Sequence, residues 1–131
     1  RGVMVAIISS GVDIFVGMIA AMLKVDDWVA NGFDWDEDGW MNGPAPSRVL
    51  SFEKGIMVDK LRRINSFSPN RIVSVGDSGS DLSMMIEGSS FIGFNPAGTW
   101  SADAFKEAGV PVVKSRDLRD IWPILMDGEK F

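Results

Sequence analysis

The sequence predicts an α/β fold, Rossmann-like and three-layered, with a mostly parallel sheet. Short apolar runs of strand length alternate with stretches of helical length, and this alternation is typical of parallel sheets connected by helices. The first run, Val3 to Ile8, is continuously apolar, as in strands that are buried on both faces. The chain has 131 residues, 46% of them hydrophobic, which suits one globular domain.

The other elements follow in a regular order. Residues Asp13 to Lys24 predict a helix that is acidic at its start and basic at its end, as the helix dipole favours. The acidic tract Asp34 to Gly39, flanked by Phe33 and Trp40, predicts a hairpin turn between two short strands. After it we expect a loop over Asn42 to Pro46 and a helix over Phe52 to Asn65, with Ile56, Leu61 and Ile64 on its inner face. Three further strands are expected, over Arg71 to Val75, Phe91 to Phe94 and Val110 to Val113. They are followed in turn by helices over Asp81 to Glu87, Ser101 to Ala108 and Leu118 to Met126.

Composition excludes several classes of function. A formal net charge of −5 without a basic block argues against binding to nucleic acid or to an anionic membrane surface. The uncharged apolar run Ile14 to Leu23 is too short to span a bilayer. Cysteine is absent, which fits a reducing compartment, and we expect a cytoplasmic protein. Histidine is absent too, so proton transfer near neutral pH would fall to carboxylates, lysine or metal-bound water.

Two carboxylates, Asp77 and Asp81, lie in a glycine- and serine-rich turn directly after a predicted strand. Carboxylates at the carboxyl end of a buried strand are placed to hold a hard cation where open α/β sheets bind ligands. The same turn also has a purely structural interpretation, in which Ser78 or Ser80 caps the next helix, Asp81 complements its dipole and Gly79 supplies the bend. The turn alone does not decide between the two.

Two other places carry polar groups of interest. Ser9, Ser10 and Gly11 end the first predicted strand, where hydroxyl and backbone N–H groups could cradle a phosphate or simply cap the following helix. Lys54 lies near the start of a predicted helix, where a positive charge opposes the helix dipole. An anionic partner would explain this lysine, and a solvated surface charge remains the alternative.

Taken in order, three motifs resemble those of the haloacid dehalogenase (HAD) superfamily, and most closely its phosphoserine phosphatase branch. The motifs are Ile8-Ser9-Ser10-Gly11, Glu53-Lys54-Gly55 and Gly76-Asp77-Ser78-Gly79-Ser80-Asp81. The resemblance covers nearly the whole chain and implies a HAD-type fold.

The resemblance also implies roles. Ser9 would hydrogen-bond the transferring phosphoryl group, Lys54 would neutralise its charge, and Asp77 would bind Mg²⁺ directly, with Asp81 as a second carboxylate acting directly or through water. Ser10 stands where the family often has glycine, and Ser80 where close relatives often have asparagine. The implied catalytic residues are Lys54, Asp77 and Asp81, the metal ligands Asp77 and Asp81, and the substrate-binding residues Ser9, Ser10, Gly11, Lys54 and Ser80.

One departure from the family pattern is large. Members begin with an Asp-x-Asp motif on a central first strand, and its first Asp is the nucleophile. The chain offers only Asp34-Trp-Asp36, which no buried strand precedes. Arg1-Gly2 has the look of a helix end. We therefore expect residues 1–131 to be the C-terminal part of a HAD-like core domain, without its first central strand and without the substrate-selecting cap.

The function implied is a Mg²⁺-dependent phosphomonoester hydrolase that works through an aspartyl-phosphate, with this chain inactive alone. Phosphoserine is the substrate that the resemblance implies first, and phosphoglycolate or another small phosphomonoester is the alternative. We expect the vacant strand position to be filled by a separate N-terminal fragment, by a strand swapped within a homodimer, or by rearranged pairing.

Motifs of other functional classes fit the sequence less well. Asp34, Asp36, Asp38 and Gly39 match the opening of an EF-hand calcium loop, but its twelfth position is Ala45 instead of glutamate. No Gly-Lys-Ser/Thr occurs, which argues against a P-loop nucleotide site. A non-catalytic α/β interaction or metal-binding domain remains as the alternative function.

Overall fold

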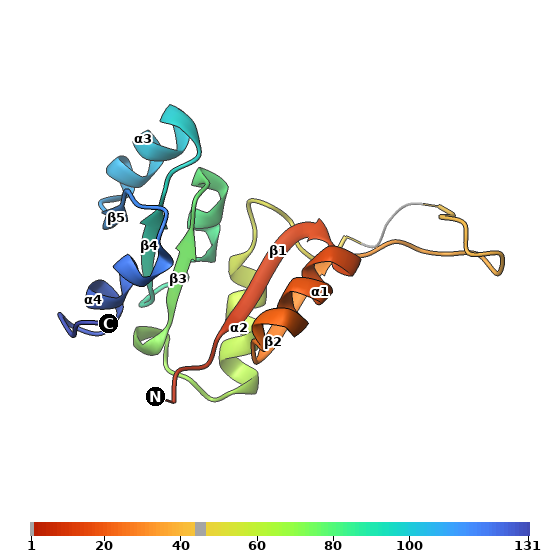
Figure 1. Ribbon diagram of the computed structural model, residues 1–131, viewed down its shortest axis with the longest axis horizontal. Helices are drawn as coiled ribbons and strands as arrows, with labels where there is room; N and C mark the ends of the chain where they lie inside the picture. Colours follow the sequence, from red (N-terminus) through yellow and green to blue (C-terminus); the bar gives the residue numbers. More distant parts are fainter. Residues whose placement is uncertain (1, 44–46) are drawn as a thin grey trace.

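The computed structural model describes residues 2–43 and 47–131, and in them the predicted α/β fold is confirmed (Figure 1). Strands alternate with helices, and all pairs of named strands run parallel. The strands are β1 (Ala6–Val12), β2 (Asp27–Asn31), β3 (Val73–Gly76), β4 (Ser90–Phe94) and β5 (Val112–Val113). The helices are α1 (Asp13–Leu23), α2 (Gly55–Ile64), α3 (Gly98–Ala108) and α4 (Trp122–Leu125), with 3₁₀ turns η1 (Pro69–Arg71), η2 (Gly79–Met84) and η3 (Leu118–Ile121).

The strands form two small sheets instead of one. β1 pairs with β2, and the second sheet has the order β3-β4-β5. β1 and β3 point the same way in Figure 1, yet within residues 2–43 and 47–131 they do not pair with each other. β1 and β3 thus each leave one edge without a strand partner from the described part of the chain. This division is compatible with the expectation that a central strand belongs between β1 and β3.

One apolar cluster holds the second sheet against its helices and reaches the first sheet. Val58, Met84, Phe91 and Phe105 are its buried members. Ile8 of β1 packs against the cluster, as do five other partly buried residues, Ile72, Leu82, Ile86, Val110 and Val112. Contact between the two sheets therefore rests on side-chain packing, because no strand ladder joins them within the described residues.

The first strand differs from its predicted bounds. β1 does not end at Ile8 but continues through the two serines to Val12, and α1 follows at once. Its pairing with β2 is regular from Ala6 to Ile8 and then shifts before Val12. No side chain caps α1, so capping by Ser9 or Ser10 is wrong. β2 itself was not predicted, because only three consecutive apolar residues mark it.

Three predicted elements need correction. Ile56 and Ile64 are exposed instead of facing inward, because Val58 lies on the buried stripe of α2. The predicted helix from Asp81 to Glu87 is the 3₁₀ turn η2, which ends at Met84. The C-terminal helix is divided into η3 and α4, since Pro123 lacks the N–H that a continuous helix would need there.

The acidic hairpin is smaller than expected. Trp35 and Met41 form one isolated antiparallel bridge, and no strands extend from it within the described residues. The hairpin projects away from the sheets in Figure 1. Part of the predicted loop that follows, residues 44–46, lies outside the described residues.

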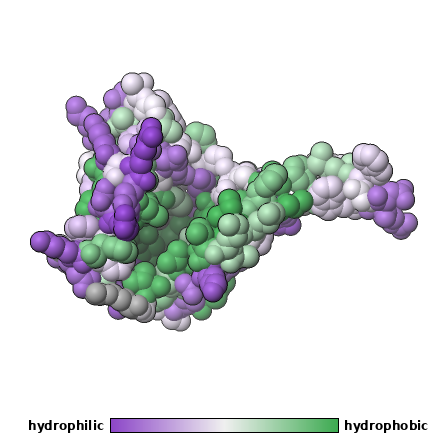
Figure 2. Space-filling view, in the orientation of Figure 1, coloured by the Kyte–Doolittle hydropathy of each residue, from purple (hydrophilic) through white to green (hydrophobic). Residues whose placement is uncertain are grey.

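α1 leaves most of its apolar side chains uncovered. Only Val16 and Ala20 are buried in this helix. Figure 2 shows apolar side chains gathered over α1 and along the hollow beside it. The exposed apolar residues of α1 are Ile14, Phe15, Met18, Ile19, Met22 and Leu23. Despite this apolar surface, none of the described helices has the length and hydropathy needed to cross a membrane.

Phe105 is the central contact of the second sheet, and its truncation should be costly. Its side chain is 0% exposed, and its ring lies 5.4 Å from that of Phe91. Phe105→Ala should lower the free energy of unfolding by about 3–5 kcal/mol, because it leaves a cavity. Phe52→Ala, the same change at a 71% exposed ring, is the control and should cost less than about 0.5 kcal/mol. Urea denaturation followed by circular dichroism measures both, and equal losses would contradict this account of the core.

Candidate functional site

The structure brings Lys54 and Asp81 into direct contact. The Lys54 ammonium donates a hydrogen bond to Oδ1 of Asp81, and the two side chains are only 8% and 10% exposed. Lys54 is the residue that precedes α2, and Asp81 lies in η2, 27 residues further along the chain. The pair therefore joins the start of α2 to the turn that follows β3.

Ser83 fixes the backbone of Lys54 on η2. The Lys54 N–H donates to Ser83 Oγ at 3.1 Å, and that hydroxyl lies 2.8 Å from the Ser80 carbonyl oxygen. The next residue, Gly55, is so close to η2 that an added Cβ would lie 2.6 Å from the Ser83 carbonyl oxygen. A side chain at this position would push α2 away from η2 and separate the ion pair.

Asp81 is held on both carboxylate oxygens. Oδ1 accepts from Lys54, and Oδ2 accepts from the backbone N–H of Ser78 at 3.1 Å. Ser78 and Asp81 form a reciprocal capping box, so the structural interpretation of this turn is confirmed for these two residues. Gly76 allows the close approach, because a Cβ there would lie 2.4 Å from that of Asp81.

Asp77 differs from Asp81 in being exposed and unengaged. Its backbone carbonyl accepts from the Ala97 N–H at 2.8 Å, which anchors the loop to the residues before α3. No residue within 2–43 and 47–131 makes a hydrogen bond or ion pair with its carboxylate. Asp77 is thus the carboxylate of this turn whose oxygens are free to bind a cation.

The donor set can be compared with the needs of Mg²⁺. This ion is usually held by one or two carboxylates together with waters and substrate phosphate oxygens. Asp77 fits that pattern as a direct ligand, whereas Asp81 would have to give up Lys54 or Ser78 to become one. Across the described residues no cluster of three or more acidic side chains is suited to a metal ion. The residues fit a metal that is held largely by water and phosphate oxygens.

The serine segment lies at the carboxyl end of β1. The Gly11 N–H donates to Ser9 Oγ at 3.0 Å, and the Ser10 carbonyl accepts from the side chain of Asn31. Within the described residues, no hydrogen bond or ion pair joins this segment to Lys54 or to the turn after β3. β1 and β3 do point the same way, so both groups of residues are at carboxyl ends of parallel strands (Figure 1).

The Asp34 to Gly39 hairpin does not behave as a metal loop. Asp36 Oδ1 accepts from the backbone N–H groups of Asp38 and Trp40, at 3.0 and 2.8 Å, so the carboxylate stabilises its own turn. Ala45, which stands at the twelfth position of the EF-hand pattern, lies outside the described residues. The hairpin also projects from the body of the molecule, unlike a motif at the end of a central strand.

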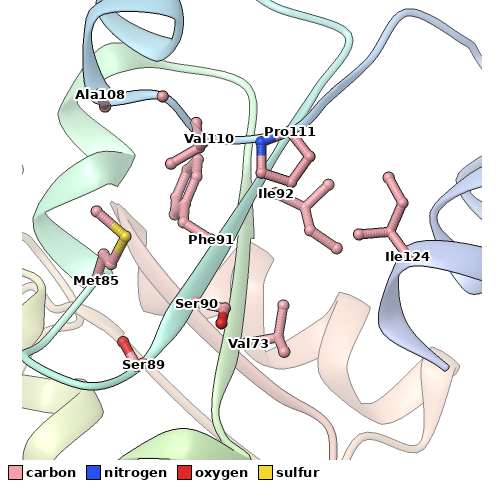
Figure 3. Close-up of a pocket in the computed structure, with 11 residues that line it drawn as sticks. Val73, Met85, Ser89, Ser90, Phe91, Ile92, Ala108, Val110, Pro111 and Ile124 are labelled. Carbon is pink, nitrogen blue, oxygen red and sulfur yellow. The ribbon is translucent and has the colours of Figure 1, made fainter. Parts of the chain in front are cut away.

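A separate pocket lies between β3, β4 and α4 and contains none of the predicted site residues. In Figure 3, Ile92, Pro111 and Ile124 point toward one another across it, and serine hydroxyls are the only polar side-chain groups drawn. Its lining carries no titratable side chain. Such a pocket lacks the charge needed to bind a phosphate or a metal ion.

The comparisons with known proteins agree on one group. No protein family model matches the chain. The chain is 32% identical over 122 residues to the phosphoserine phosphatase of Methanocaldococcus jannaschii, covering 92% of this chain and 55% of that protein. A solved phospho-aspartyl intermediate analogue of phosphoserine phosphatase matches with a TM-score of 0.80 and 30% identity, over 95% of this chain and 57% of that one.

Two further structures extend the comparison. The apo form of phosphoserine phosphatase matches with a TM-score of 0.79 and 30% identity, over 93% of this chain and 58% of that one. A HAD family hydrolase from Salmonella enterica matches with a TM-score of 0.78 over 97% of this chain and 42% of that one, and at 18% identity it shows the fold alone. The chain spans little more than half the length of the phosphoserine phosphatases that it matches.

The buried ion pair generates a test of stability. Lys54→Met should lower the free energy of unfolding by about 3–5 kcal/mol, because it leaves the Asp81 carboxylate buried without its counter-charge. Adding Asp81→Leu in the same molecule should cost less than the sum of the two single changes. Lys60→Met, on the exposed side of α2, is the matched control. Strictly additive losses in urea denaturation would mean that the two side chains are not energetically coupled.

Proposed function

Because the chain is phosphoserine phosphatase-like in sequence and in fold, we propose that the complete protein is a Mg²⁺-dependent phosphomonoester hydrolase. The observation that carries the proposal is the pairing of buried Lys54 with Asp81 beside the exposed carboxylate of Asp77. This places a cation and a free carboxylate at the carboxyl end of one parallel strand. Such an arrangement suits the binding of a metal ion and a phosphoryl group side by side.

Each side chain has a distinct task in the proposed mechanism. Lys54 faces the phosphoryl oxygens with the N–H donors that Asp81 does not use, since an ammonium has three. Asp81 holds this ammonium in place through their hydrogen bond. The hydroxyl of Ser9 and the backbone at Ser10 and Gly11 bind the phosphoryl oxygens from the side of β1. Ser80, in the same turn as Asp81, is proposed to contact the substrate.

Mg²⁺ would be held directly by Asp77, with Asp81 contributing through water. When bound, the ion supplies positive charge to the phosphoryl oxygens. The protein then has to keep Asp77 unpaired and accessible, which the anchoring of its backbone by Ala97 achieves without using the carboxylate.

The nucleophile is not among the residues of the candidate site. We propose that an aspartate attacks phosphorus to give an aspartyl-phosphate, and that it comes from a strand paired between β1 and β3. The unjoined edges of the two sheets support this position. On this proposal residues 1–131 are the C-terminal part of a core domain and do not turn over substrate alone. The strand and its aspartate would come from a separate N-terminal fragment, because a second copy of this chain carries the same sequence and no further Asp-x-Asp motif.

The substrate proposed is phosphoserine, and phosphoglycolate or another small phosphomonoester is the alternative. The support is the similarity to proteins named phosphoserine phosphatase, over little more than half of their length. The proposed partner is therefore a small phosphorylated metabolite. A cytoplasmic location is proposed from the cysteine-free composition.

The metal-binding role of Asp77 can be tested in the complete protein with para-nitrophenyl phosphate. Wild-type protein should release phosphate in Mg²⁺, and EDTA should abolish the release. Asp77→Asn keeps the shape but removes the negative charge, so kcat should fall by about 10²-fold or more. Asp103→Asn, on the exposed surface of α3, makes the same change elsewhere and should leave kcat unaltered. Full turnover by the Asp77 variant would exclude this role.

A second kinetic test concerns Lys54. Lys54→Met removes the charge and keeps most of the stem, and kcat should fall by about 10²-fold because charge in the transition state is no longer balanced. Rates are expressed per folded molecule, because the same change is expected to destabilise the protein. Lys60→Met serves as the control. If KM rises and kcat does not change, Lys54 binds the ground state only, and its proposed catalytic task is wrong.

A further inference from the structure

We infer that Asn31 is a positioning residue that holds the serine segment of β1 in register with the segment leading to Lys54. This inference rests on the proposed function. Asn31 is the half-buried last residue of β2. Its Nδ2 donates to the carbonyl oxygens of Ser10 and Val49, at 2.9 and 3.1 Å. Its Oδ1 accepts from the backbone N–H groups of Arg48 and Val49, both at 2.8 Å.

These four hydrogen bonds use every donor and acceptor of the Asn31 side chain. A carboxamide has two N–H donors and two acceptor lone pairs on its oxygen, and all four are engaged here. Two of the bonds bind both backbone groups of Val49, as a neighbouring strand would. A side chain that is merely polar could not replace this set, because only a carboxamide carries both functions in this geometry.

The segments that Asn31 joins belong to the two halves of the proposed site. Ser10 lies in the proposed phosphoryl cradle, and Val49 is 2% exposed and lies five residues before Lys54. The chain between them includes a turn in which the Glu53 N–H donates to the Leu50 carbonyl at 3.0 Å. A buried Val49 and a short turn leave little freedom for Lys54 to move relative to Asn31. The side chain therefore links the cradle to the segment that leads to Lys54.

The irregular pairing of β1 with β2 explains why a side chain is needed. The ladder is regular from Ala6 to Ile8 and then shifts before Val12 pairs with Asn31. Ser10 lies in this irregular stretch, and its carbonyl takes the side-chain N–H of Asn31. The position of the cradle thus depends on one side chain where a regular strand would use backbone bonds.

Arg48 reinforces the same junction from the other side. Its guanidinium donates to Asp13 Oδ2 and to the Ala30 carbonyl, each at 3.3 Å. A Cβ at Gly32 would lie 2.4 Å from the guanidinium, so a larger residue there would shift the Arg48 side chain. The start of α1 and the end of β2 are therefore tied to the same segment that Asn31 binds.

The test uses the complete protein with Asn31→Asp, which keeps the acceptor and turns the donor into an oxygen facing two carbonyls. The matched control is Asn65→Asp, at an exposed residue whose side chain makes one bond, to the Leu61 carbonyl at 2.9 Å. With para-nitrophenyl phosphate, Asn31→Asp should lower kcat by about 10²-fold per folded molecule, because the cradle is displaced. Asn65→Asp should change kcat by less than about twofold.

Backbone NMR separates positioning from general destabilisation. In Asn31→Asp, hydrogen exchange at the Arg48 and Val49 amides should stay slow, since their acceptor remains, while the Ser10 carbonyl ¹³C shift should move. Loss of kcat together with fast exchange throughout the protein would overturn positioning and indicate a purely structural role. A kcat within about threefold of wild type would also overturn it.

The test also has to allow for an inactive wild-type protein and for a variant that does not fold. If wild-type protein hydrolyses no phosphomonoester, the proposed function is wrong. The Ser10 carbonyl ¹³C shift then tests by itself whether Asn31 positions the serine segment. An unchanged shift in Asn31→Asp overturns that positioning. If Asn31→Asp does not fold, Asn31→Ala replaces it without adding a charge. Retention of kcat by Asn31→Ala would overturn the inference, and a loss of about 10-fold or more with folded NMR spectra supports it.

Discussion

Two opposite charges buried side by side tie α2 to the turn after β3, and the geometry of the candidate site follows from that contact. Removing an ammonium and a carboxylate from water costs several kcal/mol each, and their attraction repays this only when the surroundings supply further hydrogen bonds. Here Asp81 gains the Ser78 N–H, and the backbone of Lys54 gains Ser83. The ion pair is therefore held by bonds that also shape η2. With η2 fixed, Asp77 is left at its start with its carboxylate in solvent.

The division of the strands into two sheets sets a second constraint. Strand edges and apolar helix faces are stable in water only when something covers them, because unpaired backbone groups and exposed apolar area both cost free energy. This chain leaves the edges of β1 and β3 unjoined and most of the apolar side chains of α1 exposed. Contacts such as those of Ile8 with the second sheet's core hold the halves together, but they do not replace a ladder. A strand between the two edges would satisfy the backbone groups of both.

An element could be predicted from the sequence when the interactions that determine it lie within the element itself. β4 and α1 were predicted within a residue at each end, because an apolar run or a dipole-matched helix carries its own signal. β2 was missed, since its stability comes from pairing with β1 and its sequence alternates little. The turn η2 was predicted as a helix to Glu87, because the cap at Ser78 has a local sequence signal whereas the early end at Met84 has none.

The site shows the same division. Lys54, Asp77 and Asp81 stand out from residue type and position at element ends, but their pairing does not. The family resemblance implies Asp81 as a second metal-binding carboxylate, acting directly or through water, and the structure adds that its oxygens accept from Lys54 and Ser78. Asn31 was missed altogether, because three of its four bonds go to the backbone at residues 48 and 49, beyond the hairpin that follows β2. The one available signal was an asparagine directly after the short apolar run of residues 28–30.

Charge explains why the proposed metal and the lysine are needed together. Asp77 and Asp81 carry two negative charges against the single positive charge of Lys54, so this turn is net negative. A phosphomonoester dianion would meet repulsion there, and at a few ångströms between partly buried charges that repulsion amounts to several kcal/mol. Lys54 alone does not remove this repulsion, because its one positive charge faces both Asp81 and the phosphoryl group. A divalent cation on Asp77 would reverse the balance, since it would add two positive charges next to the only carboxylate of the turn that the described residues leave free. Metal binding is therefore the step that would convert this turn from one that repels phosphate into one that binds it, and Asp81 keeps the lysine in place while that happens.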